Sequence, residues 1–571
     1  MLSILISSTF NDMQAERDVI RTRVEPALRK VAAQYGQSVR LLDLRWGVNT
    51  ANMSEEEASQ KVLDVCLDEI DRCDGYMVCL LGNRYGWVPD YSKVDSVQRH
   101  GVLMEEPVSV TELEIQYGLL QRNQGERAIV FFRDEVCDLP EELYDQYNDP
   151  AKDLRQSILK EKLEQLNYTN CTHYRLNSLP DGEFGGLDLF AQMLLEQLTK
   201  LIQRIFSNEA AYTSVQQQTK KFESIMDEAY DGYLPVPELE NALRDFRQST
   251  ADYMVISGAQ GMGKSAFAAR LYQEPPAGVR IIPYFCGMDV HKTEPVHILR
   301  YFAGVLNEKN YCETAALDEA KEQLTESLCK IEEPVWFVID GLEQIDGKGE
   351  ALISWLPQNL PSHVRILITA SIEEKSWQQL EEFHQVQSVK IPPLKNAEEF
   401  MNRQLASRGK EIPKELLKKV AKHRLSGSYF FCDMVMRMLL LINRNDFLLM
   451  RQAGDGIDSI NGYIRRKLEN LPKTFEEMTF LFLFDCGAQI MSGNAGDYIA
   501  AIACSPIGLR AQDLQSIFPE HWDEPEFAFF TEFLEGYLVE DENGCYRLRA
   551  GIVQQAGPDQ ILKISRADLF S

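Results

Sequence analysis

The sequence predicts an α/β protein of several domains, in which two mostly parallel sheets precede a helical region and a small domain that ends in a hairpin. Three observations predict this fold class. Short apolar strands alternate with amphipathic helices over residues 1–205, and a glycine-rich loop joins a strand to a helix within residues 246–395. Helices then dominate until two β-like runs close to the end of the chain. Alternating strands and helices are typical of sheets that are covered by helices on both faces.

Length and composition agree with several folded domains. The 571 residues, 44% hydrophobic and 26% charged, suffice for about three or four cores of ordinary composition. The 87 acidic residues outnumber the 59 basic ones, which gives a net charge of −28. That balance makes nucleic acid an unexpected partner and disfavours anionic membranes. Because no apolar run approaches the ~20 residues of a membrane span, no membrane partner is expected either.

The cysteines indicate a reducing compartment. Twelve cysteines are scattered without a C-x-x-C pair. The chain also opens directly on a strand-like run, Ser3–Ser7, and not on a basic and apolar signal. We therefore expect free thiols in a cytoplasmic protein.

The first region predicts a doubly wound parallel sheet, whose ligand crevice lies at the carboxyl ends of the strands. The expected strands are Ser3–Ser7, Ser38–Leu44, Gly75–Leu81 and Ala128–Phe132, and the expected helices are Met13–Tyr35, Ser54–Asp71 and Ser109–Leu120. Hydroxyl, arginine and aromatic side chains follow the first three strands, at Ser7–Phe10, Asp43–Gly47 and Gly82–Trp87. These residues, Ser7 and Arg84 among them, are candidates for holding a ribose, a phosphate or a base.

Two glutamates lie in the first turns of the helix that begins near Ser109. Ser109 and Glu112 have the spacing of a capping box, so Glu112 most simply satisfies the helix N-terminus. Two interpretations of Glu114 stay open. It is either an acid placed favourably near the helix dipole, or a catalytic acid for attack at an anomeric carbon.

The glycine-rich loop carries the strongest motif. Residues Ser257–Ala266, S-G-A-Q-G-M-G-K-S-A, satisfy G-x-x-x-x-G-K-[ST] between an apolar strand and a helix. Glycines let backbone N–H groups surround phosphate oxygens, Lys264 adds a cation, and the Ser265 hydroxyl suits Mg²⁺. The residues expected to hold ATP or ADP in this loop are Gly258, Gly261, Gly263, Lys264, Ser265 and Ala266.

Two later strands complete the expected nucleotide site. An apolar strand, Val335–Ile339, ends at Asp340, which is expected to hold Mg²⁺ together with Ser265. Glu343 follows and is expected to polarise the attacking water. A further strand starts at Val364 and ends in hydroxyls, so Ser371 is expected to sense the γ-phosphate.

The regions around the nucleotide domain are mainly helical. Residues 206–245 predict a helical linker, residues 396–459 a small helical lid, and residues 460–571 a winged-helix domain. The last assignment depends on helices followed by a small hairpin, Tyr537–Glu540 and Cys545–Arg549. Such a domain suggests DNA binding by default, but the acidic balance argues against it.

The first region resembles the TIR-like amino-terminal domain found before NTPase modules in telomerase-associated, nephrocystin-like and bacterial signalling proteins. The matching stretches are Ile6–Asp18, Leu42–Val48, Cys66–Asp71, Leu80–Pro89 and Ser109–Ile115. TIR-type relatives place a catalytic glutamate early in the corresponding helix, in a pattern like E-I-x-x-G/A. The resemblance therefore implies that Glu114, in Glu114–Gly118, cleaves an N-glycosidic bond, as in NAD⁺.

The order of phosphate loop, apolar strand with D-G-L-E, strand with T-A-S and then Ile391–Leu394 resembles the STAND class of signal-transducing NTPases, close to its NACHT branch. The resemblance implies a slow ATPase that ADP keeps closed and that ATP and a trigger open for self-association. It implies antiphage defence in bacteria. It also implies that the winged-helix domain clamps ADP, with Arg549 reaching the β-phosphate.

Two other functions stay open beside this switch: an ATP-hydrolysing scaffold whose first domain only recruits partners, and an AAA-like motor on nucleic acid. Relatives usually continue into sensor repeats, and no period of ~20 to 50 residues recurs here. Either the sequence is part of a longer protein, or sensing falls to the existing domains or a separate subunit. The expected trigger is unknown, with a phage protein or a sensor subunit as candidates.

Overall fold

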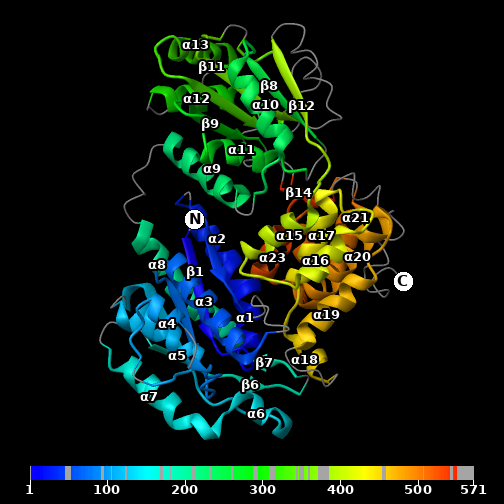
Figure 1. The fold of residues 1–571 in the computed structure, drawn as a ribbon. Helices are drawn as coiled ribbons and strands as arrows, with labels where there is room; N and C mark the ends of the chain where they lie inside the picture. The colour runs from blue at the N-terminus through cyan, green and yellow to red at the C-terminus, as the bar shows by residue number, and fades with distance from the viewer. Residues whose placement is uncertain are drawn as a thin grey trace.

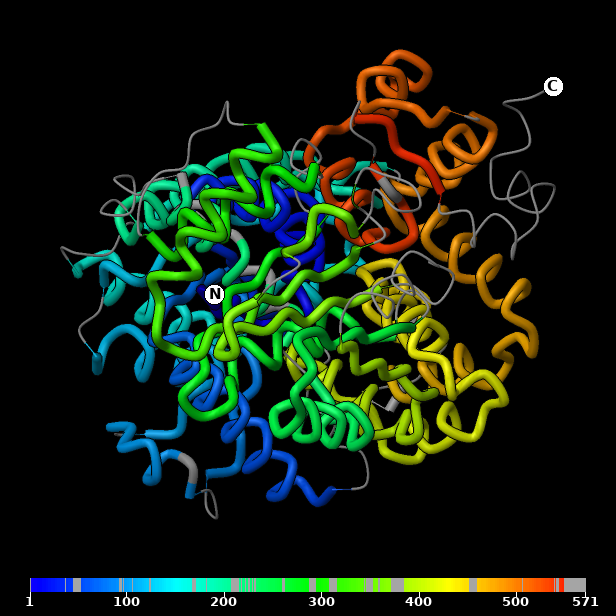
Figure 2. The backbone as a smooth tube through the Cα atoms, turned by 90° about the horizontal axis from the view of Figure 1, so that it is seen from above, coloured from blue at the N-terminus to red at the C-terminus, as the bar shows by residue number. Residues whose placement is uncertain are grey.

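The structure is a computed structural model. It describes residues 2–35, 37–44, 53–91, 95–104, 106–122, 125–166, 171–180, 182–206, 214–230, 233–258, 262–286, 294–307, 316–342, 345, 353–357, 360–370, 385–452, 458–505, 507–540 and 544–548. Figure 1 shows the second sheet above the N-terminal domain, with the helices α15 to α23 alongside. Figure 2, seen from above, shows the yellow-to-red segments to one side of both sheets.

The N-terminal domain contains the predicted doubly wound sheet. Its five strands are all parallel and lie in the order β2-β1-β3-β4-β5. They are β1 (Leu2–Ser8), β2 (Val39–Leu42), β3 (Met77–Leu81), β4 (Ala128–Arg133) and β5 (Cys171–Tyr174). The strand order reverses at β1, so the crevice is expected beyond the carboxyl ends of β1 and β3. The predicted strands are confirmed, and β5 is an additional edge strand.

Helices cover both faces of this sheet because successive strand residues point to opposite sides. Ile4 and Ile6 pack under one set of helices, whereas Leu5 packs under the other. The first face is covered by one continuous helical stretch, α1 (Gln14–Val19), η1 (Ile20–Val24) and α2 (Glu25–Ala33), together with α8 (Leu187–Phe206). The second face is covered by α3 (Glu55–Arg72), α5 (Val110–Ile115), η3 (Gln116–Gln121) and α7 (Asp153–Glu164).

Shorter elements of the N-terminal domain surround these layers. They are α4 (Ser96–Arg99), η4 (Gly125–Arg127), η5 (Glu141–Leu143), α6 (Tyr144–Tyr147), η6 (Pro150–Lys152) and the hairpin of β6 (Asn177–Ser178) and β7 (Phe184–Gly185).

The second sheet is the nucleotide-type sheet that the glycine-rich loop predicts. Its parallel strands lie in the order β12-β8-β11-β10-β9, and they are β8 (Tyr253–Ser257), β9 (Arg280–Phe285), β10 (Val335–Asp340), β11 (Val364–Ala370) and β12 (Val386–Lys390). The strands β8 and β10 are buried along their whole length, and β11 between them is buried except at Arg365, as expected for a parallel sheet covered on both sides. The helices α11 (Lys264–Gln273), α12 (Pro295–Asn307) and α13 (Leu317–Leu328) belong to this domain.

The segment predicted as a linker packs on this sheet. It contains α9 (Ser214–Tyr230) and α10 (Pro237–Gln248). Phe222 of α9 lies in the core of the nucleotide domain, where its ring centroid is 5.1 Å from that of Tyr284 and 5.3 Å from that of Tyr301. Leu239 and Phe246 of α10 lie in the same core, so the chain between the two sheets adds two helices to the second domain.

The last region joins the lid and the winged helix in one body. Its helices are α15 (Ala397–Ala406), α16 (Lys414–Ala421), α17 (Tyr429–Leu440), α18 (Arg444–Gln452), α19 (Asp458–Glu469), α20 (Phe475–Gln489), η12 (Met491–Gly493), α21 (Ala495–Cys504), α22 (Ala511–Ile517) and α23 (Glu524–Phe533). The strands β13 (Leu509–Arg510), β14 (Leu538–Glu540) and β15 (Cys545–Leu548) form an antiparallel sheet. This order of helix, strand, two helices and hairpin is that of a winged helix. A single apolar core runs from Met401 of the lid to Tyr537 of the winged helix.

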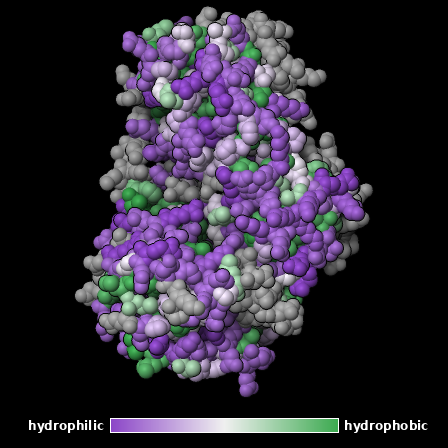
Figure 3. Space-filling view, viewed as in Figure 1, coloured by the Kyte–Doolittle hydropathy of each residue, from purple (hydrophilic) through white to green (hydrophobic). Residues whose placement is uncertain are grey.

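The face of the molecule seen in Figure 3 is largely polar, with scattered apolar residues. Within the described ranges, none of the helices is both long and apolar enough to cross a bilayer.

Candidate functional site

The glycine-rich loop lies between β8 and α11, as its sequence predicts. Gly258 follows β8 beside Ile391, where an added Cβ would make an ordinary van der Waals contact at 3.4 Å. Gly263 caps α11 with a φ of +87°, a conformation that favours glycine. Lys264 is buried, and its Nζ donates to the carbonyl of Gly258 at 2.9 Å. The N-terminus of α11 and the buried Lys264 ammonium group therefore both lie at the glycine-rich loop, where phosphates are expected to bind.

The predicted metal-binding pair meets beneath this loop. The Ser265 Oγ donates to Asp340 Oδ2 at 2.6 Å, and Asp340 is only 6% exposed at the end of β10. Thr369 of the intervening strand β11 donates to the other carboxylate oxygen at 2.6 Å and accepts from the backbone N–H of Gly341 at 2.9 Å. A hydroxyl and a carboxylate are ligands that suit Mg²⁺ when phosphates and waters complete its shell.

Three neighbouring strands therefore fix the orientation of the carboxylate. Asp340 comes from β10, and β11 separates this strand from β8, where the loop begins. The buried Thr369 holds one oxygen of Asp340, so the other faces Ser265. Because Asp340 and Thr369 are both buried, the hydrogen bond between them restricts the carboxylate rotamer strongly. The role of Thr369 was not predicted. The feature that could have predicted it is a hydroxyl residue near the end of β11, the strand next to the one that carries Asp340.

A cavity of about 290 Å³ opens beside the loop. Its walls come from the nucleotide domain, the segment before α10, the lid and the winged helix together. They include Met262, Gly263, Ala266, Tyr233, Val236, Phe400, Gln404, Tyr429, Asp433, Arg437, Gly536 and Tyr537. Most of these side chains are apolar or aromatic, which is usual for a pocket that receives a base.

Three polar residues at the back of this cavity were missed by the motif analysis. Arg437 Nε and the Tyr537 hydroxyl both donate to Asp433 Oδ2, at 2.8 Å and 3.0 Å. Arg437 also donates to the carbonyl of Phe533. Asp433 and Arg437 lie four residues apart in an otherwise apolar helix, and that spacing was the available signal. The cluster joins the lid to the winged helix at the cavity wall.

Four predicted site residues lie outside the described residues. They are Gly261 of the loop, Glu343 after β10, Ser371 after β11 and Arg549 after β15. Their roles stay predictions. The described loop residues Gly258, Gly263, Lys264, Ser265 and Ala266 all lie around the start of α11 or the cavity beside it.

The N-terminal domain places Glu114 under the end of β1. Its carboxylate is buried and accepts a hydrogen bond from the Ser7 Oγ at 2.5 Å. Burial raises the pKa of Glu114, and hydrogen bonds from Ser7 and Cys66 and the charge of Arg17 oppose that rise. Glu114 and Ser7 are thus brought together, at the end of the sheet where the crevice was expected. In this conformation the Glu114 carboxylate is hydrogen-bonded to Ser7 and Cys66 of its own domain.

The other crevice residues make internal contacts. The Arg84 guanidinium donates to the carbonyl of Asp145. The Glu112 backbone N–H donates to the Ser109 Oγ at 3.2 Å, which confirms the Ser109 half of the predicted capping box. The other half is wrong, because the Ser109 backbone N–H donates to the Tyr85 hydroxyl at 3.3 Å and the Glu112 carboxylate accepts from that hydroxyl instead. Arg84 is thus directed at the α6 segment, away from Glu114.

A buried ion cluster supports the end of β4. Arg133 is 1% exposed and pairs with Asp12 at 2.6 Å and with Glu16 at 2.8 Å. The acidic pair raises the pKa of the guanidinium against the effect of burial. The close approach of Gly82, where a Cβ would meet the guanidinium at 2.6 Å, requires glycine. This cluster has a structural role, because its ion pairs join the end of β4 to the residues at the start of α1.

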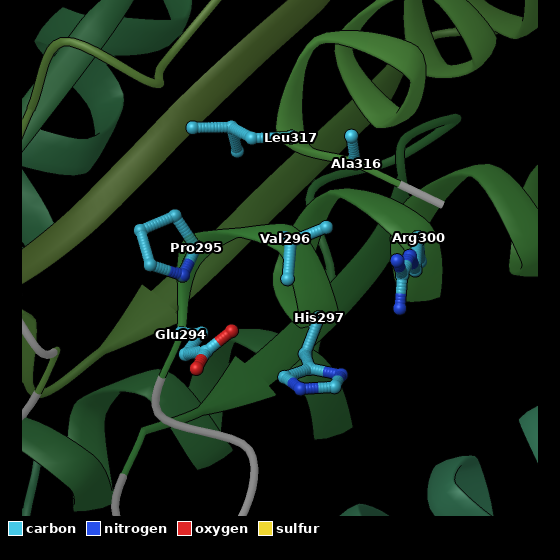
Figure 4. Close-up of a pocket in the computed structure, with 7 residues that line it drawn as sticks. All are labelled: Glu294, Pro295, Val296, His297, Arg300, Ala316 and Leu317. Carbon is cyan, nitrogen blue, oxygen red and sulfur yellow. The ribbon is translucent and has the colours of Figure 1, made fainter. Parts of the chain in front are cut away.

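A second cavity, of about 400 Å³, lies at the start of α12. Figure 4 shows Glu294, Pro295, Val296, His297 and Arg300 from the start of α12 opposite Ala316 and Leu317. Of the predicted site residues that the structure describes, none lines this cavity.

Two family models match the chain, one for each sheet. Residues 252–406 match the NACHT domain, and residues 3–177 match a domain of unknown function called DUF4062. The chain therefore contains a P-loop nucleotide-binding domain of the NACHT kind behind a DUF4062 domain. The predicted NACHT-like class is confirmed, whereas the TIR-like character of the first domain stays a prediction.

The chain is similar to parts of much longer proteins. It is 25% identical to telomerase protein component 1 of Rattus norvegicus in an alignment over 458 residues that covers 72% of this chain and 17% of that protein. It is 24% identical to the putative tetratricopeptide repeat protein 41 of Homo sapiens over 461 residues, 66% of this chain and 35% of that protein. A TPR repeat-containing protein of Dictyostelium discoideum is 30% identical over 194 residues, 30% of this chain and 11% of its own length.

Solved structures match with low overall scores. A STAND protein with a tetratricopeptide repeat sensor from Pyrococcus horikoshii is 11% identical, covers 57% of this chain and 42% of its own, and has a TM-score of 0.29. The ORC2 protein of Aeropyrum pernix, in its ADPNP and ADP complexes, is 14% identical, covers 59% and 97%, and has a TM-score of 0.31.

Proposed function

We propose that the protein is an ATP/ADP-controlled signalling switch that self-associates on activation. The observation that carries this proposal is the position of the phosphate loop. The loop and the Ser265–Asp340 pair lie beside a cavity that the lid and the winged helix also line. A nucleotide bound there contacts parts of the chain that belong to different bodies, so its identity changes how those bodies fit together.

In this proposal each part of the nucleotide is bound by its own set of residues. The N-terminus of α11 and Lys264 receive the phosphates, and the aromatic cavity near Tyr429 receives the base. Ser265 and Asp340 would hold Mg²⁺, which would supply positive charge at the phosphates. Glu343 then orients and polarises the attacking water, and Ser371 senses the γ-phosphate. Arg549 reaches the β-phosphate of ADP from the winged helix.

The switch is tested by the mass of the full chain in solution. We expect a monomer with ADP and a larger assembly with Mg²⁺ and a non-hydrolysable ATP analogue once the trigger is supplied, or at high protein concentration. Native mass spectrometry or light scattering measures both states. Lys264→Ala is expected to stay in the ADP-like state under both conditions. An unchanged mass at all analogue concentrations, with nucleotide binding demonstrated, would contradict the switch and favour an ATP-hydrolysing scaffold.

The N-terminal domain is the effector in this proposal, and in bacteria the role is antiphage defence, with a phage protein or a separate sensor subunit as the trigger. This part is supported by the resemblance of the motifs and by the position of Glu114 at the end of β1. Glu114 is buried against Ser7, so activity requires the crevice to open. A motor on nucleic acid is less favoured, because the net charge is −28.

The effector proposal predicts consumption of NAD⁺ by the assembled protein. Glu114 would stabilise the positive charge that develops on the ribose as nicotinamide leaves. We expect the wild-type assembly to consume NAD⁺ and Glu114→Gln to lose most of this activity while assembling normally. Chromatography of NAD⁺ and of nucleosides after incubation measures the reaction. If an intact assembly consumes neither substrate, the domain is an adaptor.

A further inference from the structure

The helix α23 occupies the recognition position of the winged helix. In helix-turn-helix proteins that bind DNA, the second helix of the motif enters the major groove. Here α23 packs against η1 and α2 of the N-terminal domain, as Figure 1 also shows. Its first turn carries Glu524 and Glu526 after an Asp523 N-cap, which suits a basic protein surface better than a phosphate backbone.

Arginines of the N-terminal domain face this helix. Arg23 pairs with Asp523 at 3.3 Å and with Glu526 at 3.5 Å. Arg29 pairs with Glu532 at 2.7 Å, and the side chains of this pair are 29% and 33% exposed. Partly buried pairs are screened less than fully exposed ones, so they contribute to orientation and adhesion.

The apolar part of this contact lies between the ion pairs. The guanidinium carbon of Arg21 lies 5.8 Å from the ring centroid of Phe529, which is itself buried. Arg21 also donates to the carbonyl of Leu440, at the end of α17. The same arginine therefore contacts both the winged helix and the lid.

The lid in turn contributes an arginine that packs against the N-terminal domain. Arg444, at the start of α18, is buried against the N-terminal domain. Its Nη2 donates to the carbonyl of Gly182 at 2.6 Å, its guanidinium lies 4.7 Å from the ring centroid of Phe184, and its backbone N–H donates to Asp18 at 2.7 Å. A desolvated arginine with a planar stacking partner is a common anchor of protein interfaces.

A third contact reaches the crevice of the N-terminal domain. Lys410 donates through Nζ to the carbonyl of Asp43 at 2.5 Å, just after β2. The carboxylate of Asp43 pairs with Arg17, whose Nε donates to the Ser8 Oγ at 2.9 Å. Ser8 is adjacent to Ser7, the partner of Glu114. The loop 407–411 of the lid thus contacts a chain of side chains that ends at the crevice.

The last region has two interfaces, one between the lid and the winged helix and one between this body and the N-terminal domain. The two interfaces differ in their chemistry. The lid and the winged helix share one apolar core, in which Tyr537 packs on Phe430 and Phe482. The contact of this body with the N-terminal domain consists largely of the ion pairs and arginine contacts described above. Apolar cores of this kind are cooperative, whereas polar interdomain contacts are sensitive to salt and open more readily.

We propose that α23, the start of α18 and the loop 407–411 together form a docking surface for the N-terminal domain. We infer further that this joint opens while the lid and the winged helix stay together. The winged helix then serves as a protein-docking module, and its release frees Asp43 and the crevice. The inference holds whether or not the N-terminal domain is an enzyme, and it does not depend on nucleotide binding.

The test is a charge exchange at Arg29 and Glu532 in the full chain. Hydrogen–deuterium exchange is measured in α2, in α23 and in α20, the last as a reference inside the shared core. We expect Arg29→Glu and Glu532→Arg each to increase exchange several-fold in both α2 and α23 without changing α20. The double variant is expected to return α23 towards the wild-type rate, because it restores the attraction across the joint with reversed signs. In α2 the recovery is expected to be smaller, because Arg29 also pairs with Glu25 of its own helix at 3.1 Å and that pair is lost.

The matched control is Arg72→Glu, an equal change of charge in α3, whose arginine pairs within its own helix with Glu69. It is expected to leave α23 unchanged. The inference is overturned if neither single variant affects the helix on the opposite side of the joint, if α20 opens together with α23, or if the double variant exchanges as fast as the single ones. High salt is expected to act like the single variants, and an unchanged α23 in high salt would also count against the proposal.

Discussion

Replacing Lys264 with alanine is expected to reduce ATP binding below the limit of calorimetry. Lys264 is buried at the start of α11 with its Nζ beside Gly258, so it supplies a desolvated cation at the phosphates. A hydrogen bond to a charged group contributes about 1.5–3 kcal/mol, and Lys264 is expected to make more than one, so we expect Kd to rise by roughly 100-fold or more. The backbone dipoles of the loop would remain.

The control for this prediction is Lys200→Ala. Lys200 is an exposed lysine of α8 that pairs with Glu196 in the same helix. This variant is expected to bind ATP like the wild type. Equal ATP affinity of Lys264→Ala and the wild type would show that the phosphate site has been assigned wrongly.

Replacing Asp340 with alanine is expected to slow ATP hydrolysis by roughly 100-fold while ATP binding largely survives, because metal coordination contributes several kcal/mol to charge stabilisation in the transition state. The structure supports this expectation, since Asp340 is held by Thr369 and faces Ser265. Phosphate release under single-turnover conditions measures the rate. Glu343→Gln is expected to have a similar effect through the attacking water.

Thr369→Val tests the orientation of the Asp340 carboxylate without removing the carboxylate itself. It keeps Asp340 but removes the hydrogen bond that orients one carboxylate oxygen. We expect a smaller loss of rate than for Asp340→Ala, with a higher Mg²⁺ concentration needed for half-maximal activity. If Asp340→Ala hydrolyses ATP at the wild-type rate, the acid of this site has been assigned wrongly.

The fold was predictable where local pattern and motif agree. Apolar runs of five to seven residues predicted β8, β10 and β11, the strands that position the nucleotide site. The edge strand β5 was missed, because Cys171–Tyr174 is short and lacks the apolar run of the central strands. Edge strands are half-exposed, so their sequences carry a weaker signal.

The site was predictable only where chemistry and sequence position coincide. The loop, Ser265 and Asp340 follow a spacing that phosphate binding dictates. Asp433 and Tyr537 come from distant segments that meet through tertiary packing, and no local pattern contains their contact. The interface of α23 with the N-terminal domain is of the same kind, because it pairs residues about 500 positions apart, such as Arg29 with Glu532.

A structure of the full chain with Mg²⁺ and a non-hydrolysable ATP analogue tests the central claim most directly. The account predicts phosphates at Lys264 and the N-terminus of α11, Mg²⁺ between Ser265 and Asp340, and the base in the cavity that Tyr429 lines. It also predicts that the body of lid and winged helix is placed differently from its position with ADP. A nucleotide bound elsewhere, or the same arrangement with both nucleotides, would contradict an ATP/ADP-controlled switch.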